Sequence, residues 1–197
     1  GSALAGKKIT VACDTNFMPF EFKKDGEFVG FDIDLWDAIA QEIGIDYKLQ
    51  PMDFNGIIPA LQSRNVDIAI AGITITEERE QIVDFSDPYY DSGLRLLVRE
   101  SNSDVNEFDD LEGKKIGTKI GSTSYDYLVA NLDANDGVTP YPGSSDMYMA
   151  LMSRAIDAVF YDAPNVGYFA RTKGEGKVTT VGPLYEGQQY GIALKNG

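Results

Sequence analysis

The segment AGITITEERE, residues 71–80, places an arginine, Arg79, where a helix is expected to begin after an apolar strand. The planar guanidinium of arginine suits a carboxylate, because it donates two parallel hydrogen bonds. The hydroxyl of Thr74 and the free N–H groups of a helix start would add further donors. This segment therefore predicts half of a carboxylate receptor. The alternative is a surface arginine that pairs with Glu78 or Glu80.

Other side chains suited to ligand binding lie close to the ends of predicted strands. Asp14 and Asp162 each follow such a strand, where they serve either as ligand acceptors or as caps of the next turn or helix. Phe17 and Phe54, taken singly, fit a core position better than a ligand contact. A functional role for these residues depends on whether the fold brings them together.

Composition excludes several classes of function. The chain has 31 acidic and 17 basic residues and a net charge of -14, which disfavours nucleic-acid binding. Histidine is absent, so Ser-His-Asp and Cys-His catalysis are excluded.

The pair Asp32 and Asp34 has no third acid nearby in the sequence, which favours a helix cap and a structural carboxylate over a metal site. The segment KIGSTS, residues 119–124, lacks a full phosphate-loop pattern, which disfavours nucleotide binding. We expect no catalytic residue, cofactor or metal, and Cys13 is expected to be a buried apolar residue in a strand.

The first ninety residues alternate strand and helix patterns, which predicts an α/β fold with a mostly parallel sheet. The predicted strands are 8–13, 46–51 and 66–72, with a hairpin over 20–31 that turns at Asp25-Gly26. The predicted helices are 32–44, closed by Gly44, then 55–64, and a short one capped by Thr76.

Two short sequences recur in the same order, which predicts two lobes of similar topology. GKKI occurs at 6–9 and 113–116, and ALQSRNVD at 60–67 is echoed by ALMSRAID at 150–157. We assign residues 1–88 and 187–197 to lobe one and residues 89–186 to lobe two. The two crossings define a two-strand hinge.

Ligands of open α/β sheets lie beyond the carboxyl ends of the strands. The loops that follow these ends are expected at 14–17, 71–74, 119–124 and 161–165. We expect the four loops to converge on one cleft.

Several longer segments together resemble the polar-amino-acid branch of bacterial periplasmic solute-binding proteins of ABC importers, and most closely its glutamine binders. These segments are DTNFMPFEF, GFDIDLWDAIA, MDFNGIIPALQSRNVDIAIAGITITEER, DFSDPYY and QQYGIA. The resemblance implies a type II periplasmic-binding-protein fold that closes on a free L-amino acid, here glutamine, and delivers it to a membrane ABC permease without chemistry. It also implies a monomer in a periplasmic or extracytoplasmic location.

The same resemblance implies a role for each candidate residue. The α-carboxylate of the ligand would be bound by Arg79, Thr74 and a backbone N–H near Thr123, and its α-ammonium by Asp162 and the Gly72 carbonyl. The aliphatic part of the ligand side chain would lie between Phe17 and Phe54. The far end of the side chain would contact Asp14 and Lys119.

The chain departs from the glutamine-binder pattern at three places. Tyr161-Asp162 stands where those proteins carry His-Asp, which alters one side-chain contact, and Thr123 stands where they carry glycine. Family members continue beyond the point where this chain stops at Gly197, so we expect the C-terminal helices to be missing. One alternative is a lyase similar to cyclohexadienyl dehydratase, which shares the fold. Another is an engineered or truncated fragment with impaired binding.

Overall fold

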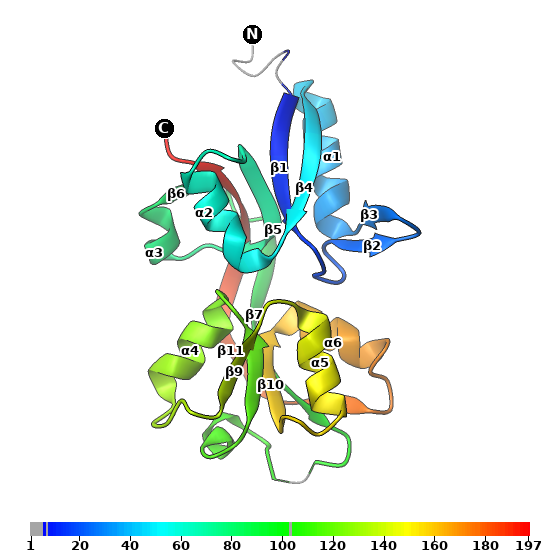
Figure 1. Ribbon diagram of the computed structural model, residues 1–197, viewed down its shortest axis with the longest axis vertical. Helices are drawn as coiled ribbons and strands as arrows, with labels where there is room; N and C mark the ends of the chain where they lie inside the picture. The colour runs from blue at the N-terminus through cyan, green and yellow to red at the C-terminus, as the bar shows by residue number, and fades with distance from the viewer. Residues whose placement is uncertain (1–5, 7, 103) are drawn as a thin grey trace. The chain divides into compact units, whose positions relative to one another are not determined.

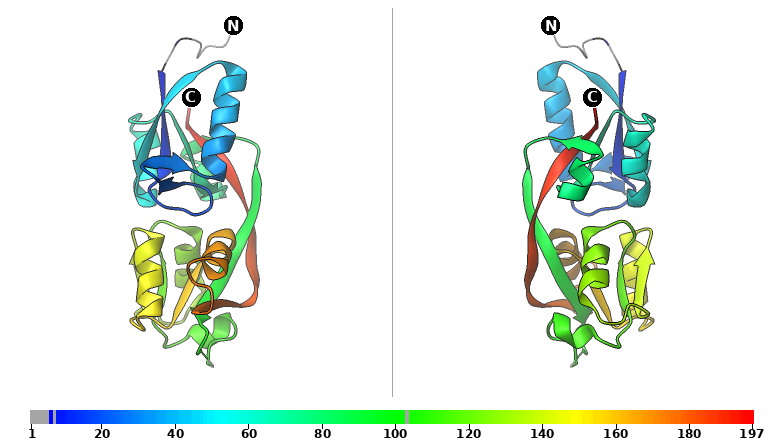
Figure 2. Two further views of the ribbon diagram at one scale, coloured as in Figure 1. Left: turned by 90° about the vertical axis from the view of Figure 1, so that its right-hand side faces the viewer. Right: turned by 90° about the vertical axis from the view of Figure 1, so that its left-hand side faces the viewer.

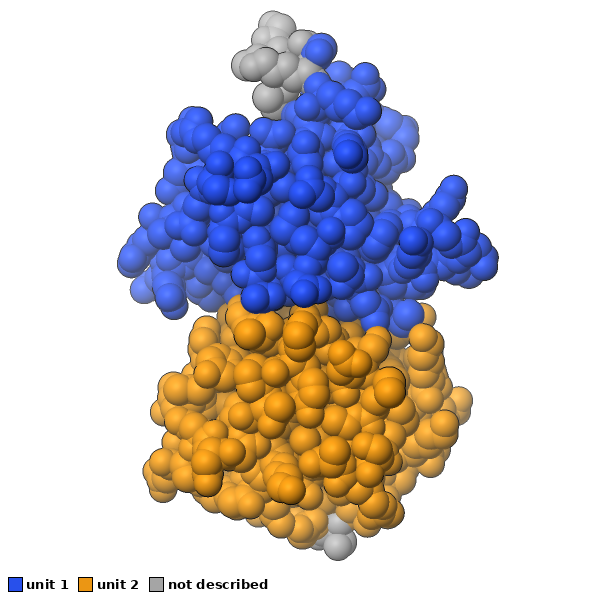
Figure 3. All heavy atoms as spheres, in the orientation of Figure 1, with its two compact units in different colours: residues 1–91, 189–197 blue, residues 92–188 orange. Residues whose placement is uncertain are grey.

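The computed structural model describes residues 6, 8–102 and 104–197. The chain divides into two compact units, which Figure 3 colours separately. Unit 1 comprises residues 1–91 and 189–197, and unit 2 comprises residues 92–188. Two strands pass from one unit into the other, β7 (Tyr90–Arg99) and β11 (Val178–Lys195). The lobe boundaries expected after residues 88 and 186 lie a few residues before these divisions.

Unit 1 is a sheet in the order β4-β1-β5-β11, with β6 paired to β11 (Figure 1). β1 pairs in parallel with β4 and β5, whereas β11 pairs antiparallel with β5. The strands of this unit are β1 (Lys8–Asp14), β2 (Phe22–Lys24), β3 (Glu27–Val29), β4 (Asp46–Met52), β5 (Ile68–Thr74) and β6 (Val83–Phe85). The helices are α1 (Phe31–Ile43), a 3₁₀ turn (Phe54–Gly56), α2 (Ile57–Gln62) and α3 (Glu77–Glu80). The predicted α/β class and parallel pairing are confirmed.

The strand β5 is buried along its whole length because helices cover both faces of the sheet. Ile68 and Ile70 pack in one core cluster with Trp36 of α1. The alternate residues Ala69 and Ala71 pack in a second cluster that contains residues of α2. The two-residue period of the strand thus divides its side chains between two cores.

Local sequence signals set the ends of these elements. Asp25 and Gly26 both have positive φ, 50° and 85°, as the turn between β2 and β3 requires, and this confirms the predicted hairpin. Gly44 ends α1 in the left-handed conformation, with φ 69°. The Thr76 side chain accepts a hydrogen bond from the Arg79 N–H, so the predicted cap of α3 is confirmed. Cys13 lies fully buried in β1, as expected.

Unit 2 repeats the strand-and-helix alternation. β8 pairs in parallel with both β9 and β10, and β10 pairs antiparallel with β7. Its remaining strands are β8 (Ile116–Lys119), β9 (Val138–Tyr141) and β10 (Ala158–Asp162). Its helices are a 3₁₀ turn (Phe108–Leu111), α4 (Thr123–Asn131), α5 (Ser144–Met152) and α6 (Ala163–Arg171), which the two views of Figure 2 also show.

Both copies of the two repeated sequences occupy corresponding positions in the two units. Each GKKI leads into a parallel strand, β1 or β8, although Lys7 of the first copy is outside the described residues. Each copy of the longer repeat begins in a helix, α2 or α5, and ends beside a strand, β5 or β10. In the described part of the chain, we find no helix with the length and apolar character needed to cross a membrane.

Candidate functional site

Arg79 belongs to α3 but directs its guanidinium back to the end of β5. Its Nη1 donates a hydrogen bond to the Thr74 carbonyl at 2.8 Å. The guanidinium carbon lies 5.6 Å from the centre of the Phe54 ring, within cation–π range. Only 9% of Arg79 is exposed, and Thr74 is buried as well. This burial contradicts the alternative of a surface arginine. Arg79, Thr74 and Phe54 form a polar and aromatic cluster at the carboxyl end of β5.

Gly72 lies two residues before the end of β5 and touches Phe17. Its φ of +53° is a left-handed conformation. A Cβ on Gly72 would lie 2.2 Å from Cε1 of Phe17, so a side chain larger than hydrogen would force the ring to move. Phe17 is buried and stacks on Phe20 with the ring centres 5.1 Å apart. Phe17 is thus a core residue that packs against the Gly72 backbone.

Asp14 ends β1 and is buried, with 1% of its surface exposed. Its Oδ1 accepts a hydrogen bond from the Asn16 N–H at 3.3 Å, which is the turn-capping role considered above. Its own N–H donates to Oε1 of Glu21. The predicted turn-capping role of Asp14 is thus observed, and it uses one carboxylate oxygen, Oδ1.

Asp32 is a structural carboxylate, as expected, but it is not a helix cap. α1 begins after Gly30 without a side-chain capping bond. Instead Asp32 accepts hydrogen bonds from the Gly72 N–H at 2.9 Å and from the Tyr89 hydroxyl at 2.8 Å. Among the described residues, no group of three or more His, Cys, Asp or Glu side chains is arranged to hold a metal ion.

Lys119 ends β8 in unit 2 and is fully buried. Its ammonium lies 5.6 Å from the centre of the Tyr161 ring. β8 and β10 are parallel neighbours, so the residues at their carboxyl ends belong to the same edge of the sheet. Lys119 and Tyr161 therefore form one cation–π pair at that edge.

Asp162 follows Tyr161 and holds the N-cap position of α6. Its side chain makes no capping hydrogen bond to that helix, so the plain helix cap is not observed. Only 5% of Asp162 is exposed. Burial raises the pKa of the neighbouring Tyr148 hydroxyl well above its usual range, and the negative charge of Asp162 raises it further. The Tyr148 hydroxyl bonds to Asn165 in the first turn of α6. Asp162 thus presents a buried negative charge at the edge where β10 ends.

Thr123 is the first residue of α4, where Ser122 is the N-cap. The Ser122 hydroxyl donates to the Lys119 carbonyl at 2.6 Å and accepts from the Tyr125 N–H. The Thr123 hydroxyl donates to Oε1 of Gln188 at 3.0 Å. Sequence reasoning missed Gln188 as a partner of this helix start, although it lies in the segment QQYGIA.

The predicted site residues therefore form two sets, one in each unit. One set lies near the carboxyl ends of strands in unit 1 and consists of Arg79, Thr74, Phe54, Gly72, Phe17 and Asp14. Lys119 with Tyr161, Asp162 and Thr123 lie at the corresponding edge of unit 2.

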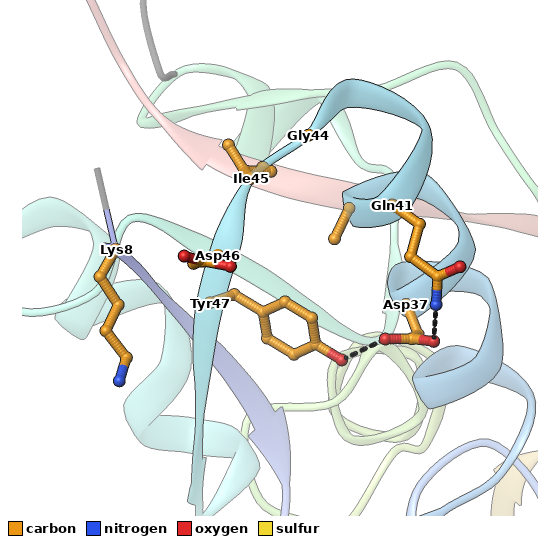
Figure 4. Close-up of a pocket in the computed structure, with 8 residues that line it drawn as sticks. Lys8, Asp37, Gln41, Gly44, Ile45, Asp46 and Tyr47 are labelled. Atoms are coloured by element: carbon orange, nitrogen blue, oxygen red, sulfur yellow. Dashed lines mark hydrogen bonds between the residues drawn. The ribbon is translucent and has the colours of Figure 1, made fainter. Parts of the chain in front are cut away.

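A hollow of about 580 Å³ lies elsewhere on unit 1, at the amino ends of β1 and β4 (Figure 4). Lys8 and Asp46, the first residues of these strands, line it. Three other polar side chains in the hollow are joined by hydrogen bonds. Asp37 accepts one from the Tyr47 hydroxyl at 3.0 Å and one from the Gln41 amide at 2.7 Å. This hollow is at the opposite end of the strands from Asp14, so it is separate from the predicted site.

The sequence and structure both match known proteins. Residues 9–178 match the model of the family described as bacterial extracellular solute-binding proteins, family 3. The L-arginine-binding protein of Pseudomonas aeruginosa is 34% identical over 202 residues, which cover 98% of this chain and 78% of that protein. The structure of an ancestral arginine-binding protein bound to glutamine has 41% identity and a TM-score of 0.91, covering 96% of this chain and 84% of that one. A second structure of an ancestral arginine-binding protein, bound to arginine, has 41% identity and a TM-score of 0.90, covering 96% and 85%.

The chain belongs to family 3 of the bacterial extracellular solute-binding proteins, and its fold is the two-lobed type II periplasmic-binding-protein fold. The relatives named above bind amino acids, which supports a role in binding solutes for ABC importers.

Proposed function

We propose that this protein captures one free polar L-amino acid, with L-glutamine preferred, and delivers it to a membrane ABC permease. The observation that carries the proposal is the buried Arg79 guanidinium, which returns to the end of β5 beside Thr74 and Phe54. A buried guanidinium needs hydrogen-bond acceptors, and a carboxylate satisfies two donors at once. Arg79 and Thr74 are therefore assigned to the α-carboxylate, with assistance from a backbone N–H near Thr123.

The α-ammonium is assigned to Asp162 and to the carbonyl of Gly72. Asp162 is a buried carboxylate at the end of β10, and a carboxylate forms charge-assisted hydrogen bonds with an ammonium group. Because Arg79 and Asp162 belong to different units, both units contribute to binding one zwitterion in this proposal. Binding then favours a closed state of the protein, which the permease recognises.

The far end of the ligand side chain is assigned to Asp14 and Lys119. A primary amide offers an NH₂ to Asp14 and a carbonyl to Lys119, so glutamine satisfies both. Glutamate would face Asp14 with a like charge, and arginine would face Lys119 with one. Like charges in a desolvated site cost several kcal/mol. Phe17 and Phe54 are assigned to the aliphatic part of the ligand, and Phe17 also packs on Gly72.

Arginine is the main competitor as ligand because structures of ancestral arginine-binding proteins contain arginine in one case and glutamine in another. Lys119 is fully buried beside Tyr161, and this favours the amide because an arginine side chain would place a second positive charge next to its ammonium. We also propose a monomeric protein in the periplasm or outside the cell, without cofactor or catalytic activity.

Calorimetric competition among L-glutamine, L-asparagine, L-glutamate and L-arginine tests the ligand. The expected order of affinity is glutamine, then asparagine, then the two charged amino acids. Asparagine is one methylene short, a deficit of about 1 to 3 kcal/mol. The variant Lys119→Met keeps the length of the side chain without its charge, and it should gain affinity for arginine relative to glutamine. If arginine or glutamate binds the parent most tightly, the amide assignment is wrong. Conversion of prephenate by the protein would contradict the absence of catalysis.

A further inference from the structure

Two acidic side chains, Glu21 and Asp32, are buried together in unit 1 directly behind Asp14 and Gly72. Neither has any exposed surface. Glu21 comes from the loop after β1, and Asp32 comes from the first turn of α1. The titratable groups that influence Glu21 are Asp32, Asp14 and Cys13, and Asp32 also contacts the Tyr89 hydroxyl. All of these groups are acids, so no basic side chain among them offsets two negative charges.

The two side chains have four carboxylate oxygens between them. Three of these oxygens accept a hydrogen bond from a described donor, and the fourth accepts none. Asp32 accepts from the Gly72 N–H at 2.9 Å and from the Tyr89 hydroxyl at 2.8 Å. Oε1 of Glu21 accepts from the Asp14 N–H at 3.3 Å. Oε2 of Glu21 is buried, and no donor from the described residues reaches it. A buried carboxylate oxygen without a donor is strongly unfavourable, whereas a protonated one becomes a donor itself.

The neighbour that can share this proton is Asp32, whose buried carboxyl group is close enough to Glu21 for each to shift the pKa of the other. Burial raises the pKa of Glu21 well above its usual range, and the negative charge of Asp32 raises it further. Burial also raises the pKa of Asp32. Two adjacent carboxyl groups in such surroundings retain one proton between them and titrate as a pair.

We propose that Glu21 and Asp32 share one proton, so that one of the two carboxyl groups is neutral and the other is ionised. This pair positions the Gly72 peptide and Asp14 for binding the amino acid. The proposal rests on the function proposed above, in which the Gly72 carbonyl receives the ligand ammonium and Asp14 meets the ligand side chain. Asp32 holds the N–H of Gly72, and Glu21 holds the N–H of Asp14. Glu21 and Asp32 are therefore positioning residues, and neither is assigned a ligand contact.

The variant Glu21→Gln tests the shared proton, because glutamine supplies a fixed N–H donor and a carbonyl in nearly the same shape. In the wild type, Glu21 has a pKa near 4.5 when unfolded and a raised pKa when folded, so folding takes up a proton between these values. Wild-type stability should then fall as pH rises above about 4.5, and this contribution is absent from Glu21→Gln. The Tm of Glu21→Gln minus that of the wild type should grow as pH rises above 4.5, until the pH passes the raised pKa of Glu21 in the folded protein. A difference that stays constant as pH rises above 4.5 would overturn the shared proton.

Ligand affinity tests the positioning role, with the tightest binder of glutamine, asparagine, glutamate and arginine as the probe. Glu21→Gln should bind within threefold of the wild type. Glu21→Ala and Asp32→Asn should each bind at least tenfold more weakly while retaining the far-ultraviolet circular dichroism of the wild type. The matched control is Asp34→Asn, an exposed acid in the same first turn of α1, which should change neither quantity.

A folded Glu21→Gln protein that has lost binding more than tenfold would overturn the positioning role. If Glu21→Ala and Asp32→Asn fail to fold, the comparison between wild type and Glu21→Gln still decides both parts. If the wild type binds none of the four amino acids, the proposed function fails, whereas the dependence of Tm on pH still decides whether the proton is shared.

Discussion

Replacing Arg79 by alanine should abolish most amino-acid binding while leaving a folded protein. Arg79 is 9% exposed and bonds the Thr74 carbonyl at 2.8 Å, so its charge is directed into the proposed site. Removing one partner of a buried, hydrogen-bonded charge pair costs about 2 to 5 kcal/mol. This corresponds to a loss of roughly 30-fold to 4000-fold in affinity for the ligand.

The same substitution leaves the Thr74 carbonyl without this donor, which should lower the free energy of unfolding by about 1 to 3 kcal/mol. Arg79→Lys keeps the charge without the planar fork, and it should bind more weakly than the wild type but more tightly than Arg79→Ala. Titration calorimetry with L-glutamine and thermal melts measure the two effects separately.

Arg171→Ala is a suitable control, since it removes the same charge from an exposed position in the last turn of α6. It should leave affinity unchanged. A Kd for Arg79→Ala within threefold of the wild type, in a protein that melts normally, would refute the assignment of Arg79 to the ligand carboxylate.

Three further predictions concern other parts of the chain. Gly72→Ala should lower the free energy of unfolding by about 2 to 5 kcal/mol, because alanine disfavours the positive φ and its Cβ meets the Phe17 ring; a Tm unchanged within a degree or so would contradict this packing. Cys13 is fully buried and its pKa is raised to about 12, so a thiol reagent should label it only on unfolding; rapid labelling of the native protein would show that β1 opens readily. Saturating ligand should reduce the radius of gyration measured by small-angle scattering, because Arg79 and Asp162 belong to different units; an identical value with and without ligand would count against closure.

The elements of unit 1 could be predicted from short-range patterns because those patterns report local physics. The apolar spacing of residues 32–44, the αL glycine that follows and the Asp25-Gly26 turn each act within a few residues. The strand predicted over 66–72 extends as β5 to Thr74, because pairing with β11 continues to that residue and no local signal records a distant partner.

The chemistry of the site was less accessible to sequence reasoning. The type of residue was enough to predict a binding role for Arg79 and Asp162, whereas the role of Asp32 depends on Gly72 and Tyr89, which are far away in the chain. Glu21 carries no signal in its own neighbourhood, because its environment is created by α1 packing on β5. Burial of several acids at one point is a property of the folded chain, and the sequence shows only an acidic surplus.

The 18-residue strand β11 has a consequence for synthesis on the ribosome. Residues 92–188 form a continuous stretch, so unit 2 has all its parts when residue 188 has emerged. Unit 1 lacks the partner of β5 and β6 until residues 189–197 follow. Lys195 donates a hydrogen bond to Asp67, which is 128 residues earlier in the chain. The entropic cost of closing a loop grows only slowly with its length. One edge of β5 therefore keeps its backbone N–H and C=O groups unpaired throughout the synthesis of unit 2, and an unpaired strand edge can pair with another chain.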